Sequence, residues 1–256
     1  MINPASAAGS SLSALHTFHA NGRSLNSVLE KLATGRRINR GADDPAGLIT
    51  SENLRAVLEA LEAESQNLGR ADQVAAVADA GLSEISGLVS EAEALVIANA
   101  NSAGLSDAEI EANQIELNSI VSTVNRIVSS TSFNGDQLLD GSATISVAGG
   151  ELTIDQISLS DPGGGEAALD SLRSFRNEVN ALRGELGAFS KYTINSRQNS
   201  VRTAIENISE AESIIRDTDY GKETSNLARV QVLIAGSLKA LGVSASQSGA
   251  LLSLFA

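Results

Sequence analysis

Apolar side chains recur along most of this chain at alternating steps of three and four residues, and this spacing constrains its fold more than any other feature. In residues 4–34 the apolar or small positions follow the rule from position 11 to position 32. A helix with one such stripe is marginal alone, because its stability comes from burying the stripe against another helix. We therefore expect long helices packed lengthwise, with a distant partner for 4–34. The stripe includes Leu15, Phe18, Leu25, Leu29 and Leu32.

Two further helices are predicted at residues 45–99 and 107–129. The first would be roughly 80 Å long at the usual rise per residue. Ser106 and Glu109 have the spacing of a capping box, in which each side chain bonds the backbone N–H of the other, so the second helix should begin there. Because the connection is short, we expect these two helices to pack antiparallel.

A small β structure is predicted near the middle of the chain. Phe133-Asn134-Gly135 has the composition of a turn. Residues 143–147 alternate small or polar with apolar side chains, and Gly149-Gly150 separates them from a second apolar stretch that ends at 157. This pattern predicts a β-hairpin within 143–157. Two strands alone are marginal, so the hairpin must pack on a helix.

The C-terminal third is predicted to be helical again, first over residues 166–217. Its apolar stripe runs from Phe175 to Phe189, is then occupied by hydroxyl side chains, and reappears at Val201 shifted by one position. Such a phase slip indicates a changed packing face or a locally altered supercoil. A last helix follows Asp219-Tyr220-Gly221, and its apolar positions include Leu227, Val230, Ile234, Leu238 and Leu241.

The predicted fold class is mainly α, a long antiparallel helical bundle or coiled coil with one small β-hairpin. The first and last helices have no local partner, so we expect them to pair with each other. This predicts an inner terminal-helix domain of residues 1–44 plus 220–256 and an outer helical-bundle domain of residues 45–219. Contacts between the chain ends carry a loop-closure cost. We therefore expect both ends to be largely disordered in a single molecule and to order when many copies pack their stripes together.

The charge distribution excludes several function classes. The net charge of the 256 residues is −13, but residues 1–41 have a net charge of +4 and residues 42–170 have −19. This acidic surface argues against nucleic-acid binding, which needs a basic footprint. The chain has no Cys and no uninterrupted apolar run long enough to span a bilayer. No cleavable secretory signal is recognisable at its start, so export would need another route.

The first two predicted helices are joined by residues 32–48, LATGRRINRGADDPAGL. Gly41 is a candidate helix stop, because Gly adopts left-handed backbone angles without strain. Asp43 or Asp44 can cap the next helix, and Pro45 suits its first position, which needs no N–H. By local chemistry this is an ordinary joint between two helices. The polar side chains expected to set its geometry are Arg36, Arg37, Asp43 and Asp44.

No catalytic or cofactor site is predicted. His16 and His19 have no third ligand nearby in the sequence, and we interpret them as partly exposed helix residues. The carboxylates are dispersed along solvent faces, whereas a catalytic pair would need burial. Gly163-Gly164-Gly165 is not followed by the Lys-Ser/Thr of a phosphate-binding loop. We therefore expect no metal, no cofactor and no enzymatic activity.

Several sequence motifs occur in a characteristic order at both ends of the chain and near its middle. They are Met1-Ile2-Asn3, Leu32-Ala33-Thr34-Gly35, Arg37-Ile38-Asn39, Asp43-Asp44-Pro45-Ala46-Gly47-Leu48, Phe133-Asn134-Gly135, Ile214-Ile215-Arg216-Asp217-Thr218-Asp219-Tyr220, Ser225-Asn226-Leu227 and Leu251-Leu252-Ser253-Leu254. Together they resemble the signature of bacterial flagellin over roughly 1–140 and 170–256.

The resemblance implies a structural subunit that polymerises into the extracellular flagellar filament. The terminal helices would pack in layers around a central channel, with the bundle outside them. It also implies export through the flagellar type III apparatus without cleavage, and contacts with an export chaperone, the filament cap and hook-junction proteins. Two alternatives are a hook–filament junction protein of the same superfamily and a secreted coiled-coil protein that does not polymerise.

Two features depart from the family pattern. Many flagellins carry arginines on an outer helix that a vertebrate innate receptor binds, and the corresponding stretch here has Glu91 and Glu93 in their place, followed by Leu95. Reversed charges at a salt-bridging surface predict weak or no recognition. In addition, residues 141–165 leave room only for a hairpin and a loop, so we expect the variable outer domains to be absent.

Overall fold

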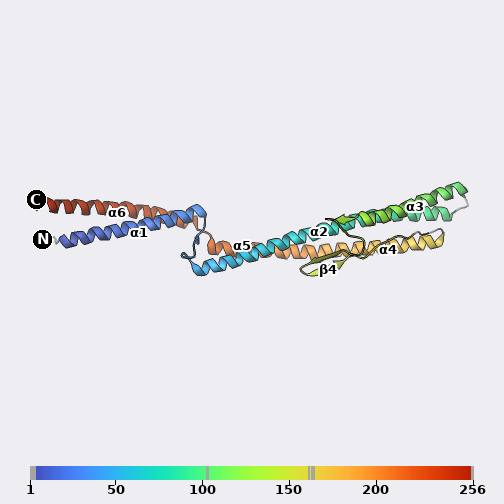
Figure 1. The fold of residues 1–256 in the computed structure, drawn as a ribbon, viewed down its shortest axis with the longest axis horizontal. Coiled ribbons are helices and arrows are strands. Elements are labelled where there is room, and N and C mark those ends of the chain that lie inside the picture. Colours follow the sequence, from blue (N-terminus) through green and yellow to red (C-terminus); the bar gives the residue numbers. More distant parts are fainter. Residues whose placement is uncertain (1–3, 102–103, 161, 163–164, 255–256) are drawn as a thin grey trace. The chain divides into compact units, whose positions relative to one another are not determined.

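The computed structural model describes residues 4–101, 104–160, 162 and 165–254. Most of these residues are helical, and four short strands among them form two hairpins (Figure 1). The prediction of a mainly α fold is therefore confirmed. The helices are α1 (Pro4–Thr34), α2 (Pro45–Ala100), α3 (Asp107–Ser130), α4 (Glu166–Ala188), the π-helix η2 (Phe189–Ile194), α5 (Asn195–Arg216) and α6 (Tyr220–Leu254). The strands are β1 (Ser132–Phe133), β2 (Asp136–Gln137), β3 (Thr144–Val147) and β4 (Gly150–Thr153).

The chain divides into two compact units. One consists of Met1–Leu58 and Glu206–Ala256, and the other is Glu59–Ile205. The terminal helices and the joint between α1 and α2 belong to the first unit, called here the terminal unit. Most of α2 and half of α5, together with α3, α4, η2 and both hairpins, belong to the second, called here the bundle unit.

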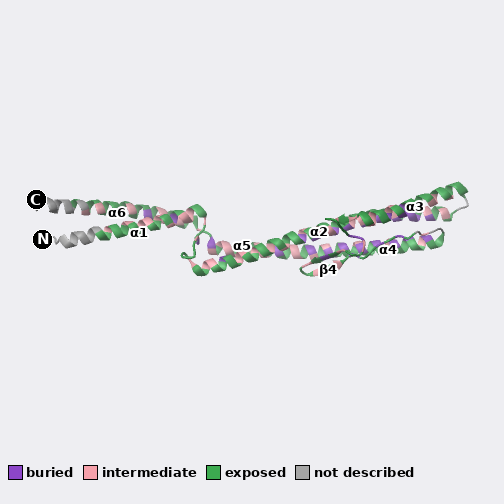
Figure 2. Ribbon diagram, in the orientation of Figure 1, coloured by how far each residue is buried: buried purple, intermediate pink, exposed green. Residues whose placement is uncertain are grey.

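In the bundle unit, α2, α3 and α4 bury their apolar sides in one shared core (Figure 2). The buried side of α2 is the stripe that the heptad spacing predicts. Ion pairs flank this core, with Arg183 Nε 2.9 Å from Asp79 Oδ1 and Arg197 Nε 2.6 Å from Glu64 Oε1. The core positions include Ala78, Leu82, Ile85, Val89, Ala92 and Val96 from α2, Leu117 and Val124 from α3, and Leu172 and Val179 from α4.

The capping box at the start of α3 is present as predicted. The backbone N–H of Glu109 donates to Ser106 Oγ, and the backbone N–H of Ser106 donates to Glu109 Oε2 at 2.8 Å. The two hydrogen bonds from Ser106, through its backbone and its hydroxyl, hold the pKa of the Glu109 carboxyl below its usual value. Local chemistry is therefore enough to set this helix start.

The predicted hairpin is formed by β3 and β4, which pair antiparallel with Thr144 opposite Thr153. Ile145 and Ile154 are buried in the bundle core, so the hairpin packs on the helices as expected. The predicted turn at Asn134-Gly135 connects the strands of a second hairpin, β1–β2, which was not predicted from the sequence. Both turn residues have positive φ, 56° and 97°, which is the requirement of a type I′ turn and explains the Asn-Gly pair.

The phase slip between α4 and α5 has a backbone cause. Residues Phe189–Ile194 form the π-helix η2, in which the N–H of Asn195 donates to the carbonyl of Ser190, five residues earlier. A π turn contains one more residue than an α turn, so the apolar stripe resumes one position late. Phe189 and Ile194 are both buried, which keeps the core continuous across the slip. The turn of the β3–β4 hairpin packs here, since a Cβ on Gly150 would lie 3.1 Å from Thr193 Cγ2.

In the terminal unit, α1 and α6 lie side by side along most of their length and run antiparallel (Figure 1). The expectation that the first and last helices pair with each other is therefore confirmed. Their contact joins segments at opposite ends of the sequence, so forming it requires closing a loop that contains most of the chain.

Candidate functional site: the terminal helix pair and its joint

The contact between α1 and α6 buries a narrow row of side chains. On α1, Val28 is 7% exposed, and on α6 Val230 is 6% and Ser237 8% exposed. Six of the residues predicted for the two stripes are half-buried. These are Phe18, Leu25 and Leu32 on α1, and Leu227, Ile234 and Leu241 on α6.

Three other predicted stripe residues lie outside the contact. Leu15, Leu29 and Leu238 are 42%, 45% and 52% exposed. The helices thus meet along Val28 and Ser237, one residue before Leu29 and Leu238, and sequence reasoning missed both of these inner positions. The apolar side of each helix is wider than one partner helix can cover, so the spacing alone does not select which edge is buried.

Large apolar side chains therefore remain exposed on both terminal helices. By length and apolar composition, Tyr220–Ser244 could cross a membrane, yet only 11% of its most apolar 18-residue stretch is buried in the single chain. Contiguous apolar side chains left exposed in this way mark an interaction surface. The exposed set consists of Leu12, Leu15 and Leu29 on α1, and Val232, Leu233, Leu238 and Val243 on α6.

The joint begins where α1 ends, at Thr34. Gly35 has φ +70°, so it supplies the left-handed residue that stops the helix, and the expectation that Gly41 does so is wrong. Arg36 forms an isolated antiparallel bridge with Asp217, next to the end of α5. The N–H of Thr218 donates to the Gly35 carbonyl at 2.8 Å. Backbone hydrogen bonds thus hold this joint to the connection between α5 and α6.

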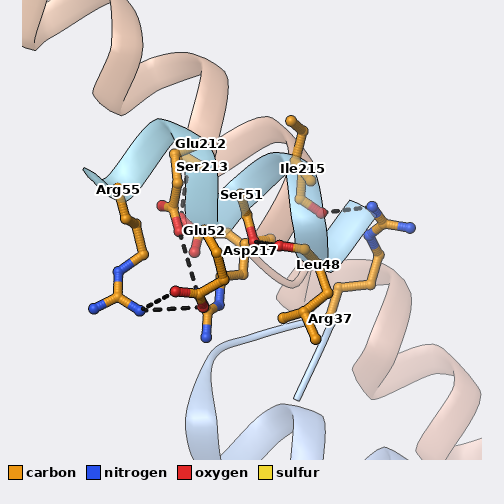
Figure 3. Close-up of polar contacts among 10 residues, drawn as sticks. Arg37, Leu48, Ser51, Glu52, Arg55, Glu212, Ser213, Ile215 and Asp217 are labelled. Carbon is orange, nitrogen blue, oxygen red and sulfur yellow. Dashed lines mark hydrogen bonds and ion pairs between the residues drawn. The ribbon is translucent and has the colours of Figure 1, made fainter. Parts of the chain in front are cut away.

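Arg37 strengthens the same contact through its backbone and its side chain. Its N–H donates to the Arg216 carbonyl at 2.7 Å, and its Nη2 donates to the Ile215 carbonyl at 2.5 Å (Figure 3). Ile38, the next residue, is 1% exposed. Arg36 and Arg37 therefore bond to the end of α5 and the residue that follows it, whereas Ile38 is buried beside α2, with its Cδ1 2.8 Å from where a Cβ on Gly47 would lie.

The two adjacent aspartates have different roles. Asp44 caps α2, because its Oδ1 accepts the N–H of Gly47 at 2.9 Å, and Pro45 occupies the first helical position as predicted. Asp43 closes the loop instead, and its Oδ2 accepts the N–H groups of Arg40 at 2.9 Å and Asn39 at 3.0 Å. These two hydrogen bonds hold the pKa of the Asp43 carboxyl below its usual value.

Arg216 is the buried charge of the joint. Its side chain is 9% exposed, and its Nη1 lies 2.8 Å from Glu52 Oε1 on α2. The Arg216 hydrogen bond is the main reason why the pKa of Glu52 is lowered, with Arg55 adding a second cation 3.2 Å away (Figure 3). Glu212 lies 3.9 Å from the same Nη1. The motif that contains Arg216 does not predict its partner, because Glu52 lies on another helix, far away in the sequence.

The segment that follows Arg216 starts α6. Asp219 Oδ1 accepts the N–H of Lys222 at 3.0 Å, which caps the helix. Asp217 accepts the hydroxyl of Ser213 at 2.6 Å. A Cβ on Gly35 would lie 2.9 Å from the Tyr220 hydroxyl, so the end of α1 and the start of α6 approach closely only because residue 35 is glycine.

The stretch compared with the receptor-binding patch lies on α2 in the bundle unit. Glu93 is buried, and its Oε2 lies 2.6 Å from Arg176 Nη1 on α4. Glu91 is exposed, and Leu95 is half-buried. The assumption that both glutamates present their charge to solvent is therefore wrong, since one of them is paired inside the bundle. The prediction of weak receptor recognition therefore rests on Glu91 alone.

The described residues contain no group of three His, Cys, Asp or Glu side chains placed to hold a metal ion. His16 and His19 lie exposed on α1, and the His19 ring contacts the edge of Phe18 with 5.9 Å between ring centroids. What the site offers is a pair of long helices with uncovered apolar sides, anchored by a hydrogen-bonded joint. This arrangement defines a subunit built for packing against other helices.

Comparison with known proteins identifies the family to which this subunit belongs. The model of the bacterial flagellin N-terminal helical region matches residues 6–144, and the model of the C-terminal helical region matches residues 169–255. The chain therefore belongs to the bacterial flagellin family and is a structural subunit of the flagellar filament. It lacks a large variable domain, because the two conserved regions are separated by only the residues between 144 and 169.

Curated relatives match nearly the whole chain. A 30.7 kDa flagellar filament core protein of Treponema maltophilum is 27% identical over 93% of this chain and 95% of its own length. A flagellin of Halalkalibacterium halodurans is 29% identical over 89% and 90%, and one of Bacillus subtilis is 27% identical over 88% and 91%. These relatives place the family in the extracellular flagellar filament, where its role is structural.

Proposed function

We propose that the terminal helix pair is the surface through which this subunit polymerises. In this proposal residues 1–44 plus 220–256 form the inner core of the filament, and residues 45–219 form the outer shell. The observation that carries the proposal is the set of large apolar side chains left uncovered on α1 and α6, including Leu15, Leu29 and Leu238. Neighbouring copies would bury them, and each addition to the polymer would stabilise the paired helices.

The contact between α1 and α6 also supports the expectation that the terminal helices are only weakly held in a dilute monomer. Ser237, a hydroxyl residue, is among the best buried positions of α6, so the contact with α1 gains less from burial than an apolar row would. Hydrogen exchange of peptides from α1 and α6 should therefore be fast in the monomer and slow in the polymer. Full protection in the dilute monomer would contradict this expectation.

The joint gives the polymer its inter-layer geometry in this proposal. Asp44 fixes the start of α2, Arg37 fixes the loop to the end of α5, and Arg216 fixes α5 to α2 through Glu52. Contacts with an export chaperone, the filament cap and hook-junction proteins are part of the proposal by resemblance to the family.

Negative-stain microscopy of concentrated or salt-seeded protein tests the proposal directly. The full chain should form filaments, and a chain without residues 222–256 should not, because α6 is then lost. No filaments from the full chain under any seeding would overturn it.

A point substitution makes a sharper test than the truncation. Leu238→Ser should raise the critical concentration about fivefold, because burying the exposed half of a leucine is worth about 1 kcal/mol. The matched control is Ile115→Ser, at a residue of α3 that is 65% exposed in the bundle unit. If the control raises the critical concentration as much as Leu238→Ser, the terminal helices are not the main polymerisation surface.

A further inference from the structure

A groove of about 500 Å³ lies between α1 and α6 near the joint. Its walls carry three cationic side chains, Arg23 and Lys31 from α1 and Arg229 from α6. None of the ion pairs among the described residues involves any of these three. Three cations therefore face one carboxylate, that of Glu223, in this groove, and Lys31 also acts on Asp43, whose pKa it helps to lower. The groove carries an excess of positive charge on a chain whose net charge is −13.

The carboxylates on the two helices offset only part of this charge. Glu30 is paired with Arg40 at 2.9 Å. Glu223 lines the groove and accepts a hydrogen bond from the neutral side-chain amide of Asn226 at 3.2 Å, so its charge offsets one of the three cations. Together α1 and α6 contain five basic and two acidic residues. The excess charge is thus a property of the whole helix pair and not of one side chain.

Two further features show that the groove is incomplete in a single chain. Asn21, which lines it, has a side-chain amide nitrogen that is buried without a hydrogen-bond partner. A buried donor without an acceptor is costly, so an acceptor that enters the groove would be favoured. Leu233 also lines the groove and is 49% exposed. An occupant with both oxygen acceptors and apolar surface fits these walls.

We propose that this groove receives a carboxylate-bearing helix surface of a second copy of this chain, taken from residues 42–170. That segment contains 22 acidic and three basic residues, and Glu59, Glu62 and Glu84 are among its exposed carboxylates. Complementary charge guides and orients association between such surfaces. The inference rests on the proposed polymerisation, and it names the partner of one part of the polymerisation surface.

Cross-linking tests this contact separately from polymerisation. A carbodiimide joins a lysine amine to a carboxylate in direct contact and adds no spacer. Filaments assembled from a mixture of ¹⁴N- and ¹⁵N-labelled copies should yield mixed-isotope peptides that join Lys31 to an acidic residue of 42–170. Filaments in which Lys31 links only to its own chain, or not at all, would overturn the inference while leaving the proposed function intact.

Charge variants provide the matched energetic test. Lys31→Gln with Arg23→Gln should raise the critical concentration about two- to fivefold for each ion pair lost. Lys31→Arg keeps the charge but removes the amine, so it should abolish the cross-link and raise the critical concentration less than Lys31→Gln does. Lys239→Gln removes a cation from α6 outside the groove and should have a smaller effect than the groove variants.

Two results would count against the contact with a second copy. Equal effects of Lys239→Gln and the groove variants would show that net charge alone controls assembly. Binding of the monomer to vesicles containing anionic lipid that is lost in the groove variants, with their assembly unchanged, would assign the groove to a membrane surface and overturn the inference.

Discussion

Replacing Arg176 by Met should destabilise the bundle unit, because Glu93 would lose its partner in the protein interior. Arg176 Nη1 lies 2.6 Å from Glu93 Oε2, and the Glu93 side chain is only 12% exposed. The other oxygen, Oε1, is buried without a hydrogen-bond partner among the described residues. Removing one member of a buried pair costs about 3–5 kcal/mol. Since the Arg176 side chain is 37% exposed and water reaches it, we expect a loss of about 2 kcal/mol.

Urea unfolding of the full chain, followed by far-ultraviolet circular dichroism, measures this loss. A loss below about 0.5 kcal/mol, which is the size expected for an exposed ion pair, would refute this reasoning.

The matched control lies one turn earlier on α4. Arg173 forms an ion pair with Asp170 at 3.8 Å, and the two side chains are 51% and 74% exposed. Arg173→Met should change the free energy of unfolding by less than about 0.5 kcal/mol, because exposed pairs contribute little. If Arg173→Met and Arg176→Met cost the same, burial of the Glu93 pair is not the cause.

Three further outcomes are expected. Gly47→Ala should lower the free energy of unfolding by about 1–2 kcal/mol, because an added Cβ would lie 2.5 Å from Asp44 Oδ2 and disturb the cap of α2. Gly22→Ala, where no described atom lies within 4 Å of the added Cβ, should not lower it, and equal losses for the two variants would contradict this explanation. Because its folded pKa is lowered, Asp43 contributes stability above its unfolded pKa that is lost as the pH falls through the folded value. Amide exchange in the joint should therefore differ between the parent and Asp43→Asn near neutral pH and converge in acid, whereas a difference that persists in strong acid would refute the role of the carboxylate. The chain should activate the innate receptor weakly in reporter cells, and Glu91→Arg should raise the response; strong activation by the parent at equal dose would count against this prediction.

The helix boundaries could be read from the sequence because their signals are local. The predicted ranges 4–34, 45–99 and 107–129 agree with α1, α2 and α3 to within one residue at each end. Heptad spacing defines the body of each helix, and Pro45 and the Ser106 capping box define two of the starts. The β3–β4 hairpin was predictable for the same reason, since its alternating side chains and the Gly149-Gly150 turn lie within a few residues of each other in the sequence.

Features that depend on the exact backbone path were predicted only in part. The shift of the apolar stripe after Phe189 was visible in the sequence, but a π turn and a change of packing face produce the same shift, and the hydrogen bond from Asn195 to Ser190 distinguishes them. The β1–β2 hairpin had its signal in Asn134-Gly135, where an Asn-Gly pair between short strands is typical of a type I′ turn. A two-residue strand is too short to show alternation.

The sequence by itself determined which segments are helical, which side of each helix is apolar, and that the first and last helices need partners, because spacing and capping act within a few residues. Only the tertiary structure decided that α1 and α6 meet along Val28 and Ser237, because each apolar side is wider than a single contact. It also decided which charges are paired: Glu93 with Arg176, and Glu52 with Arg216. These partners lie far apart in sequence, and only the packing of the helices brings their side chains together.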